Sequence, residues 1–128
     1  MSDGTIIVKV KKGLFKRKQG FAFSMWSWMQ MSEYTGLAIN DFDQLHPEVF
    51  GQKANYCAAL AYNYLNGIKV RFTEEDVIKW VNALPHSEVV MIADTMLKSR
   101  IGGQKISDLI DSDDEKKKYG PVTSGTTE

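Results

Sequence analysis

Apolar and polar positions alternate at the start of the chain, over residues 5 to 10 (TIIVKV). This is the two-residue period of a half-buried β-strand. The inward positions are Ile6, Val8 and Val10. A basic stretch follows, in which Gly13 and Gly20 are able to turn the chain, and then the apolar residues 21 to 23. The pattern predicts a strand over residues 5 to 10 within a small N-terminal hairpin.

The apolar spacing becomes helical from Ser24 to Thr35. One stripe of this helix collects four large apolar side chains, which we expect to face the core: Phe21, Met25, Trp28 and Met29. Gly36 follows where a left-handed helix terminus favours glycine, because a side chain there would clash with the preceding carbonyl. The helix is therefore predicted to end at Thr35. Residues 39 to 45 are predicted to form one or two further turns.

The longest predicted helix runs from Pro47 to Asn66. Proline suits a first helical turn because its missing N–H has no partner there, and Gly67 suits the end. The apolar arc of this helix contains Phe50, Ala54, Cys57, Leu60, Ala61, Tyr64 and Leu65. Its alanines permit close approach of other elements. We expect this helix at the centre of the core.

Two more helices follow. Thr73 is an N-cap with acidic residues in the first turn, and Pro85 stops that helix. Its inward residues are predicted to be Val77, Ile78, Trp80, Val81 and Leu84. A last helix is predicted from Ser87 to the glycines at 102 and 103. Its inward arc contains Val89, Ile92, Ala93, Met96 and Leu97.

The predicted fold is mainly α: a small helical domain of four to five helices with a short N-terminal β-strand or hairpin and a disordered C-terminal tail. With 128 residues, 43% of them hydrophobic and 25% charged, the chain suits one domain with one core. We place that domain at residues 1–103. Residues 104–128 are predicted to be weakly structured to disordered, because the charged and then Gly-, Ser- and Thr-rich sequence has little to bury.

The charges balance, with sixteen Lys and Arg against sixteen Asp and Glu. This removes the global electrostatic argument for nucleic acid or an anionic membrane as the main partner. A single cysteine, Cys57, excludes an intramolecular disulfide and indicates a reducing compartment. The N-terminus lacks the order of a signal peptide, and no apolar run approaches a membrane span. We expect the protein to work in a cytoplasm.

No sequence motif for catalysis, metal or a cofactor stands out. His46 and His86 lie beside prolines at helix boundaries, where a histidine is usually solvated or caps a helix. Cys57 falls on the inward arc of the long helix, where burial makes a thiol inert. The acids at 41, 43 and 111–115 lack the spacing of a calcium loop. We therefore predict a protein that is not an enzyme and has no cofactor.

Two segments are candidates for partner binding. The basic run from Lys9 to Lys18 can contact phosphates or form a solvated hairpin tip, and we favour the tip. The helix sequence SMWSWMQM is too apolar for one face, and extra Trp and Met can form an adaptable protein-binding surface. The alternative is that Trp26 packs under the hairpin. The candidate partner-binding residues are Trp26, Met31, Phe15, Lys16 and Arg17.

The order of these elements resembles the tail assembly chaperones of long-tailed bacteriophages. A short strand region precedes a helix that ends in Glu-x-Thr-Gly, here residues 33 to 36. A long helix rich in Ala and Tyr follows, with CAALAYNYLNG at 57–67. An acidic-capped helix, FTEEDVIKWVNAL at 72–84, and a final helix that ends in small and basic residues complete the order. The similarity spans residues 5 to 101.

The resemblance implies a non-enzymatic helper that coats the long tape measure protein, keeps it soluble and recruits tail tube subunits. It implies no cofactor, and it places the protein in the host cytoplasm during assembly and outside the mature virion. The resemblance leaves open whether the protein forms a homo-oligomer. The competing hypotheses are a virion structural protein, such as a head–tail connector, and a nucleic-acid-binding regulator that uses Lys9 to Lys18. Zero net charge and the lack of a recognition helix argue against the regulator.

The resemblance also has an implication for the tail. Chaperones of this family are often made in two forms, the longer of which arises when ribosomes slip backwards by one base. Lys116, Lys117 and Lys118 can be encoded by a run of adenines, on which such slippage occurs. A solvated charged tail explains the same residues, and we favour that interpretation. The coding sequence distinguishes the two hypotheses.

Overall fold

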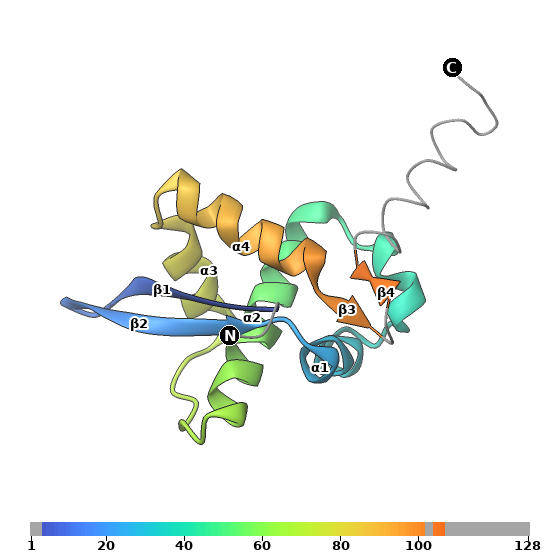
Figure 1. Ribbon diagram of the computed structural model, residues 1–128, viewed down its shortest axis with the longest axis horizontal. Helices are drawn as coiled ribbons and strands as arrows, with labels where there is room; N and C mark the ends of the chain where they lie inside the picture. Colours follow the sequence, from blue (N-terminus) through green and yellow to red (C-terminus); the bar gives the residue numbers. More distant parts are fainter. Residues whose placement is uncertain (1–3, 102–103, 107–128) are drawn as a thin grey trace, which may run out of the picture.

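The computed structural model describes residues 4–101 and 104–106, and Figure 1 shows the arrangement of their elements. The protein is mainly helical with an N-terminal antiparallel hairpin, as the sequence predicts. The elements in chain order are β1 (Thr5–Lys12), β2 (Phe15–Ala22), α1 (Met25–Thr35), the 3₁₀ helix η1 (Ile39–Gln44), α2 (Pro47–Leu65), α3 (Glu74–Asn82), α4 (His86–Lys98), β3 (Arg100–Ile101) and β4 (Gln104–Lys105).

The hairpin pairs Thr5 with Ala22 at its open end and Lys12 with Phe15 beside the turn. The predicted inward residues Ile6, Val8 and Val10 are all buried. Gly13 lies in the turn with φ of 67°, which glycine adopts without strain. The prediction that Gly20 also turns the chain is wrong. Gly20 pairs with Ile7 inside the ladder, and the absence of a side chain there makes room for the ring of Tyr62.

Helix α1 has the predicted boundaries. The Ser24 hydroxyl accepts a hydrogen bond from the N–H of Ser27 in a capping box, and Gly36 closes the helix with φ of 76°. The predicted core stripe is wrong in part. Met25 and Met29 are 41% and 56% exposed, while the buried residues of α1 are Ser27, Trp28 and Met31.

Helix α2 runs through the centre of the fold and packs antiparallel to α1. Trp26 near the start of α1 stacks on Tyr64 near the end of α2, and Tyr34 near the end of α1 contacts Tyr56. The predicted burial of Phe50, Ala54, Cys57 and Ala61 is confirmed. Leu60 is only half-buried, and the predicted burial of Tyr64 and Leu65 is wrong because their turn of α2 extends past the core.

Helix α3 begins as predicted after Thr73, whose hydroxyl accepts from the N–H of Asp76, and it buries Val77. Its other predicted inward residues, Ile78, Trp80, Val81 and Leu84, are half-buried. Helix α4 buries Ile92, but Ala93 and Leu97 are exposed, contrary to prediction.

Helix α4 ends at Lys98, earlier than predicted, and leads into the short β3–β4 pair beside α1 (Figure 1). Ile106 lies past the predicted boundary at 103, yet it is 1% exposed and its N–H donates to the carbonyl of Ser99 at 2.8 Å. The core therefore includes chain that the sequence assigned to the tail.

Residues 1–3, 102–103 and 107–128 lie outside the described part of the chain. The predicted disorder of the C-terminal segment, the acids at 111–115 and the lysines at 116–118 fall within that range. None of the helices in the described part is long and apolar enough to cross a membrane.

Candidate protein-binding surface

The outer side of the α1–α2 pair centres on an aromatic stack. The rings of Trp26 and Tyr64 are nearly parallel, with an interplanar angle of 8° and centroids 4.9 Å apart. Trp26 is half-buried and Tyr64 is 65% exposed. The ring contact of Trp26 is thus with α2, whereas one hypothesis from the sequence placed this side chain under the hairpin. Stacking fixes both rings and leaves one edge of the pair open to solvent.

Further apolar side chains are exposed on the elements that carry this stack. They come from the solvent side of α1, from the last turn of α2 and from the chain just after it. We call the following set the α1–α2 surface: Met25, Trp26, Met29, Tyr64, Leu65 and Ile68. Leu65 is 59% exposed and Ile68 is 48% exposed. Contiguous exposed apolar groups on a folded domain mark interaction sites, and flexible methionines adapt to varied partners.

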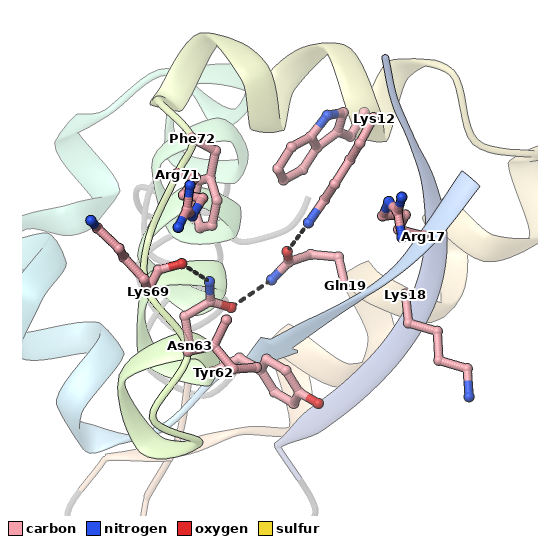
Figure 2. A pocket seen from close by; sticks show the side chains of 11 residues that line it. Lys12, Arg17, Lys18, Gln19, Tyr62, Asn63, Lys69, Arg71 and Phe72 are labelled. Atoms are coloured by element: carbon pink, nitrogen blue, oxygen red, sulfur yellow. Dashed lines mark hydrogen bonds between the residues drawn. The ribbon is translucent and has the colours of Figure 1, made fainter. Parts of the chain in front are cut away.

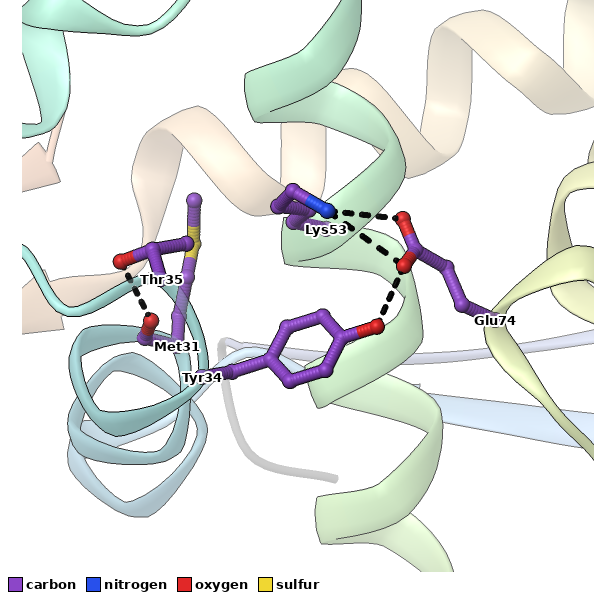
Figure 3. A network of polar contacts seen from close by, with 5 residues as sticks. All are labelled: Met31, Tyr34, Thr35, Lys53 and Glu74. Carbon is purple, nitrogen blue, oxygen red and sulfur yellow. Dashed lines mark hydrogen bonds and ion pairs between the residues drawn. The ribbon is translucent and has the colours of Figure 1, made fainter.

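A polar cluster fixes the other end of the helix pair (Figure 3). The Tyr34 hydroxyl donates to the carboxylate of Glu74, at the start of α3. The ammonium of Lys53 lies 3.4 Å from both carboxylate oxygens of Glu74 and 5.0 Å from the centre of the Tyr34 ring. The hydrogen bond to Glu74, with partial burial, raises the pKa of Tyr34 to about 12. This cluster joins α1, α2 and α3.

The structure does not bring the candidate partner-binding residues together. Trp26 lies in the α1–α2 surface. Met31 is 0% exposed, so the interpretation that it falls outside the core side of α1 is wrong. Phe15 is 64% exposed beside the hairpin turn, with Arg17 5.9 Å from its ring centre, and Lys16 is also exposed. These three residues begin β2, whereas Trp26 follows its opposite end.

The candidate chemical groups have structural roles. Cys57 is 1% exposed, and burial raises the pKa of its thiol to about 12. His46 caps α2, its Nδ1 accepting from the N–H of Glu48 at 3.2 Å, and His86 is exposed in the first turn of α4. No group of three or more His, Cys, Asp or Glu that could hold a metal occurs among the described residues.

Five of the six members of the surface were not predicted from the sequence. Met25 and Met29 were assigned to the core stripe of α1. Tyr64 and Leu65 were assigned to the core because they continue the arc of α2. Ile68 lies in a short stretch, IKVRF at 68–72, where apolar and basic residues alternate. That alternation is the available signal for an extended segment with two different faces.

Comparison of the chain with protein-family models, curated protein sequences and solved structures finds no match. The α1–α2 surface and the order of the elements are therefore the observations from which a function can be proposed.

Proposed function

We propose that this protein is a tail assembly chaperone of a long-tailed bacteriophage. It binds and solubilises the tape measure protein in the host cytoplasm, recruits tail tube subunits and is left out of the mature virion. It acts by binding and catalyses no reaction. The observation that carries the proposal is the α1–α2 surface, which combines the Trp26–Tyr64 stack with large exposed apolar side chains on the same elements.

The α1–α2 surface suits a helical partner with an apolar stripe. A tape measure protein is a long helical chain, and its apolar stripe needs cover until tube subunits surround it. Helix-in-groove recognition uses apolar anchors spaced along one face of the bound helix. Aromatic residues and methionine are enriched at protein interfaces, and few residues carry most of the binding energy. Trp26, Tyr64 and Met29 supply side chains of this kind.

Co-expression tests this proposal. The tape measure protein of the same phage is produced alone, with this chain, and with an unrelated small helical protein as control. The expected result is an insoluble tape measure protein alone and a soluble complex only with this chain. A tape measure protein that stays insoluble in its presence would contradict the proposal.

Mass spectrometry of purified particles separates the main alternative. An assembly chaperone is expected to be absent or scarce in particles, whereas a head–tail connector is present at a fixed copy number. A constant number of copies per particle would exclude the chaperone and favour the connector.

A further inference from the structure

A cavity of about 310 Å³ lies between the hairpin, the end of α2 and the chain that leads to α3 (Figure 2). Five basic residues contribute to its lining: Lys12, Arg17, Lys18, Lys69 and Arg71. The ammonium groups of Lys18 and Lys69 point away from the side chains of Gln19 and Asn63 (Figure 2). No acidic residue of the described chain lines it. We call it the basic pocket. Three of its basic residues, Lys12, Arg17 and Lys18, belong to the basic run from Lys9 to Lys18.

Two buried amides form the floor of the basic pocket. Gln19 is 3% exposed and Asn63 is 4% exposed, and the Gln19 amide nitrogen donates to the Asn63 side-chain oxygen at 3.1 Å. The Lys12 ammonium donates to the Gln19 oxygen at 2.8 Å (Figure 2). The Asn63 amide nitrogen reaches the carbonyl of Lys69 at 3.5 Å. This network holds the half-buried ammonium of Lys12 in place.

The positive charge of the basic pocket is not balanced within the described chain. The ion pairs found there join Lys53 to Glu74 and Lys98 to Asp94, and neither involves the pocket. Burial, and then the charge of Arg17, lower the pKa of Lys12. The charges of Lys12 and Arg17 repel each other in this partly buried site, and an anion bound beside them relieves that repulsion.

We infer that the basic pocket binds carboxylates from an acidic segment of a partner protein. Single-stranded nucleic acid needs free aromatic faces on which bases stack. The ring faces here are occupied, since the Lys12 ammonium lies 4.7 Å over the Trp80 ring and the Tyr62 ring packs on Gly20. Carboxylates need only the cations and donors that the pocket supplies.

The basic pocket adjoins the α1–α2 surface. Ile68 belongs to both, and Asn63 on the pocket floor directly precedes Tyr64. A helix with an apolar stripe flanked by acidic residues would therefore contact both sites at once. The statement that this helix belongs to a tape measure protein rests on the proposed function. The statement that the pocket binds carboxylates does not.

Calorimetric titration with two synthetic peptides tests the inference. One is an amphipathic helical peptide of Leu, Ala and Glu, and the other has Gln in place of every Glu. The acidic peptide is expected to bind more tightly by about tenfold, with an affinity that falls as salt is added. Replacing Arg17→Gln and Arg71→Gln together removes this preference.

The matched control replaces Lys79→Gln and Lys98→Gln, exposed residues outside the pocket, and so removes the same charge. This control is expected to retain the preference for the acidic peptide. Equal binding of the two peptides, or an equal loss in both double variants, would overturn the inference. Tighter binding of a single-stranded oligothymidylate that depends on Arg17 and Arg71 would overturn it in favour of nucleic acid.

Co-expression with the tape measure protein distinguishes the two proposals. If the pocket variant solubilises that protein as well as the unchanged chain does, the inference fails and the proposed function stands. A different result is that the acidic peptide binds through the pocket but the unchanged chain leaves the tape measure protein insoluble. In that case the proposed function fails and the inference about the pocket stands.

Discussion

Trp26 and Trp28 lie two residues apart on α1 and have opposite environments. Trp28 is 1% exposed, and its indole N–H donates to the Ser99 hydroxyl at 3.0 Å. Trp28→Ala is expected to cost about 3 to 5 kcal/mol, as for a core aromatic. Trp26→Ala removes a half-buried ring and its stack on Tyr64. The loss of the stacking contact is expected to lower the free energy of unfolding by about 0.5 to 1.5 kcal/mol.

Denaturant unfolding of the two variants tests this contrast. We expect Trp26→Ala to unfold at a denaturant concentration much closer to that of the unchanged protein than Trp28→Ala does. If both variants lose equal stability, Trp26 belongs to the core and is not an interface anchor.

Gly20 is required by the close approach of α2 to the hairpin. A Cβ at this position would lie 2.2 Å from Cδ1 of Tyr62. Gly20→Ala is therefore expected to cost about 1 to 3 kcal/mol. In a double-mutant cycle with Tyr62→Ala the cost of Gly20→Ala should shrink, because the clash is gone. Gly51→Ala is the control, since nothing lies within 4 Å and the helix gains stability. An equal cost of Gly20→Ala with and without Tyr62 would rule out the clash.

Cys57 is expected to react with a thiol reagent only after unfolding. Its thiol is buried, and a pKa of about 12 leaves almost no thiolate in the folded protein near neutral pH. In the unfolded chain this thiol ionises near its ordinary pKa, so its contribution to stability is present below that pKa and is lost as pH rises toward 12. Rapid labelling under native conditions would contradict the burial.

At the scale of elements, the sequence predicted helix ends well. Gly36, Pro47, Gly67 and Thr73 each determine a boundary through local backbone chemistry. These boundaries depend on a few neighbouring residues and can be recognised without the tertiary structure. The end of α4 was predicted too late because the chain leaves the helix after Lys98 and enters the short β3–β4 pair, which no apolar period in the sequence indicates.

The sequence could not predict which side of α1 is buried. Apolar residues surround the helix, so periodicity alone cannot choose between Met29 and Met31. The buried side of α1 is determined by its packing against α2, which follows later in the chain. For the same reason the sequence identified Trp26 as a surface candidate but assigned Tyr64 to the core. The basic pocket combines residues that are up to 68 positions apart, from Lys12 to Trp80. The basic run from Lys9 to Lys18 indicated only its hairpin side, because Lys69 and Arg71 come from the chain after α2.

The Tyr34–Glu74 contact gives α1 and α3 a pH-sensitive connection. Glu74→Gln removes the negative charge and is expected to lower the pKa of Tyr34 from about 12 toward its ordinary value. Tyrosinate absorbance during a pH titration measures this shift, and Tyr34→Phe identifies the signal. Because the folded-state pKa is raised, the stabilisation is present below the ordinary pKa and is lost as pH rises through the folded value. An unchanged titration in Glu74→Gln would show that Glu74 does not control Tyr34.

At the scale of the whole molecule, a zero net charge conceals two distinct surfaces. The α1–α2 surface is apolar, and the basic pocket beside it is cationic. The compensating acids lie elsewhere, several of them in the first turns of α3. Global composition therefore excluded a generally basic protein but did not indicate where a partner would bind.

The most direct test of the central claim is a pair of matched substitutions in the co-expression experiment. Leu65→Glu places a charge in the α1–α2 surface, whereas Leu14→Glu places the same charge at the hairpin turn, where Leu14 is 90% exposed. Both side chains are exposed, so both variants are expected to fold with little change in stability. The account predicts that Leu14→Glu keeps the tape measure protein soluble and that Leu65→Glu leaves it insoluble. Two folded variants that solubilise it equally well would contradict the claim that the α1–α2 surface is the binding site.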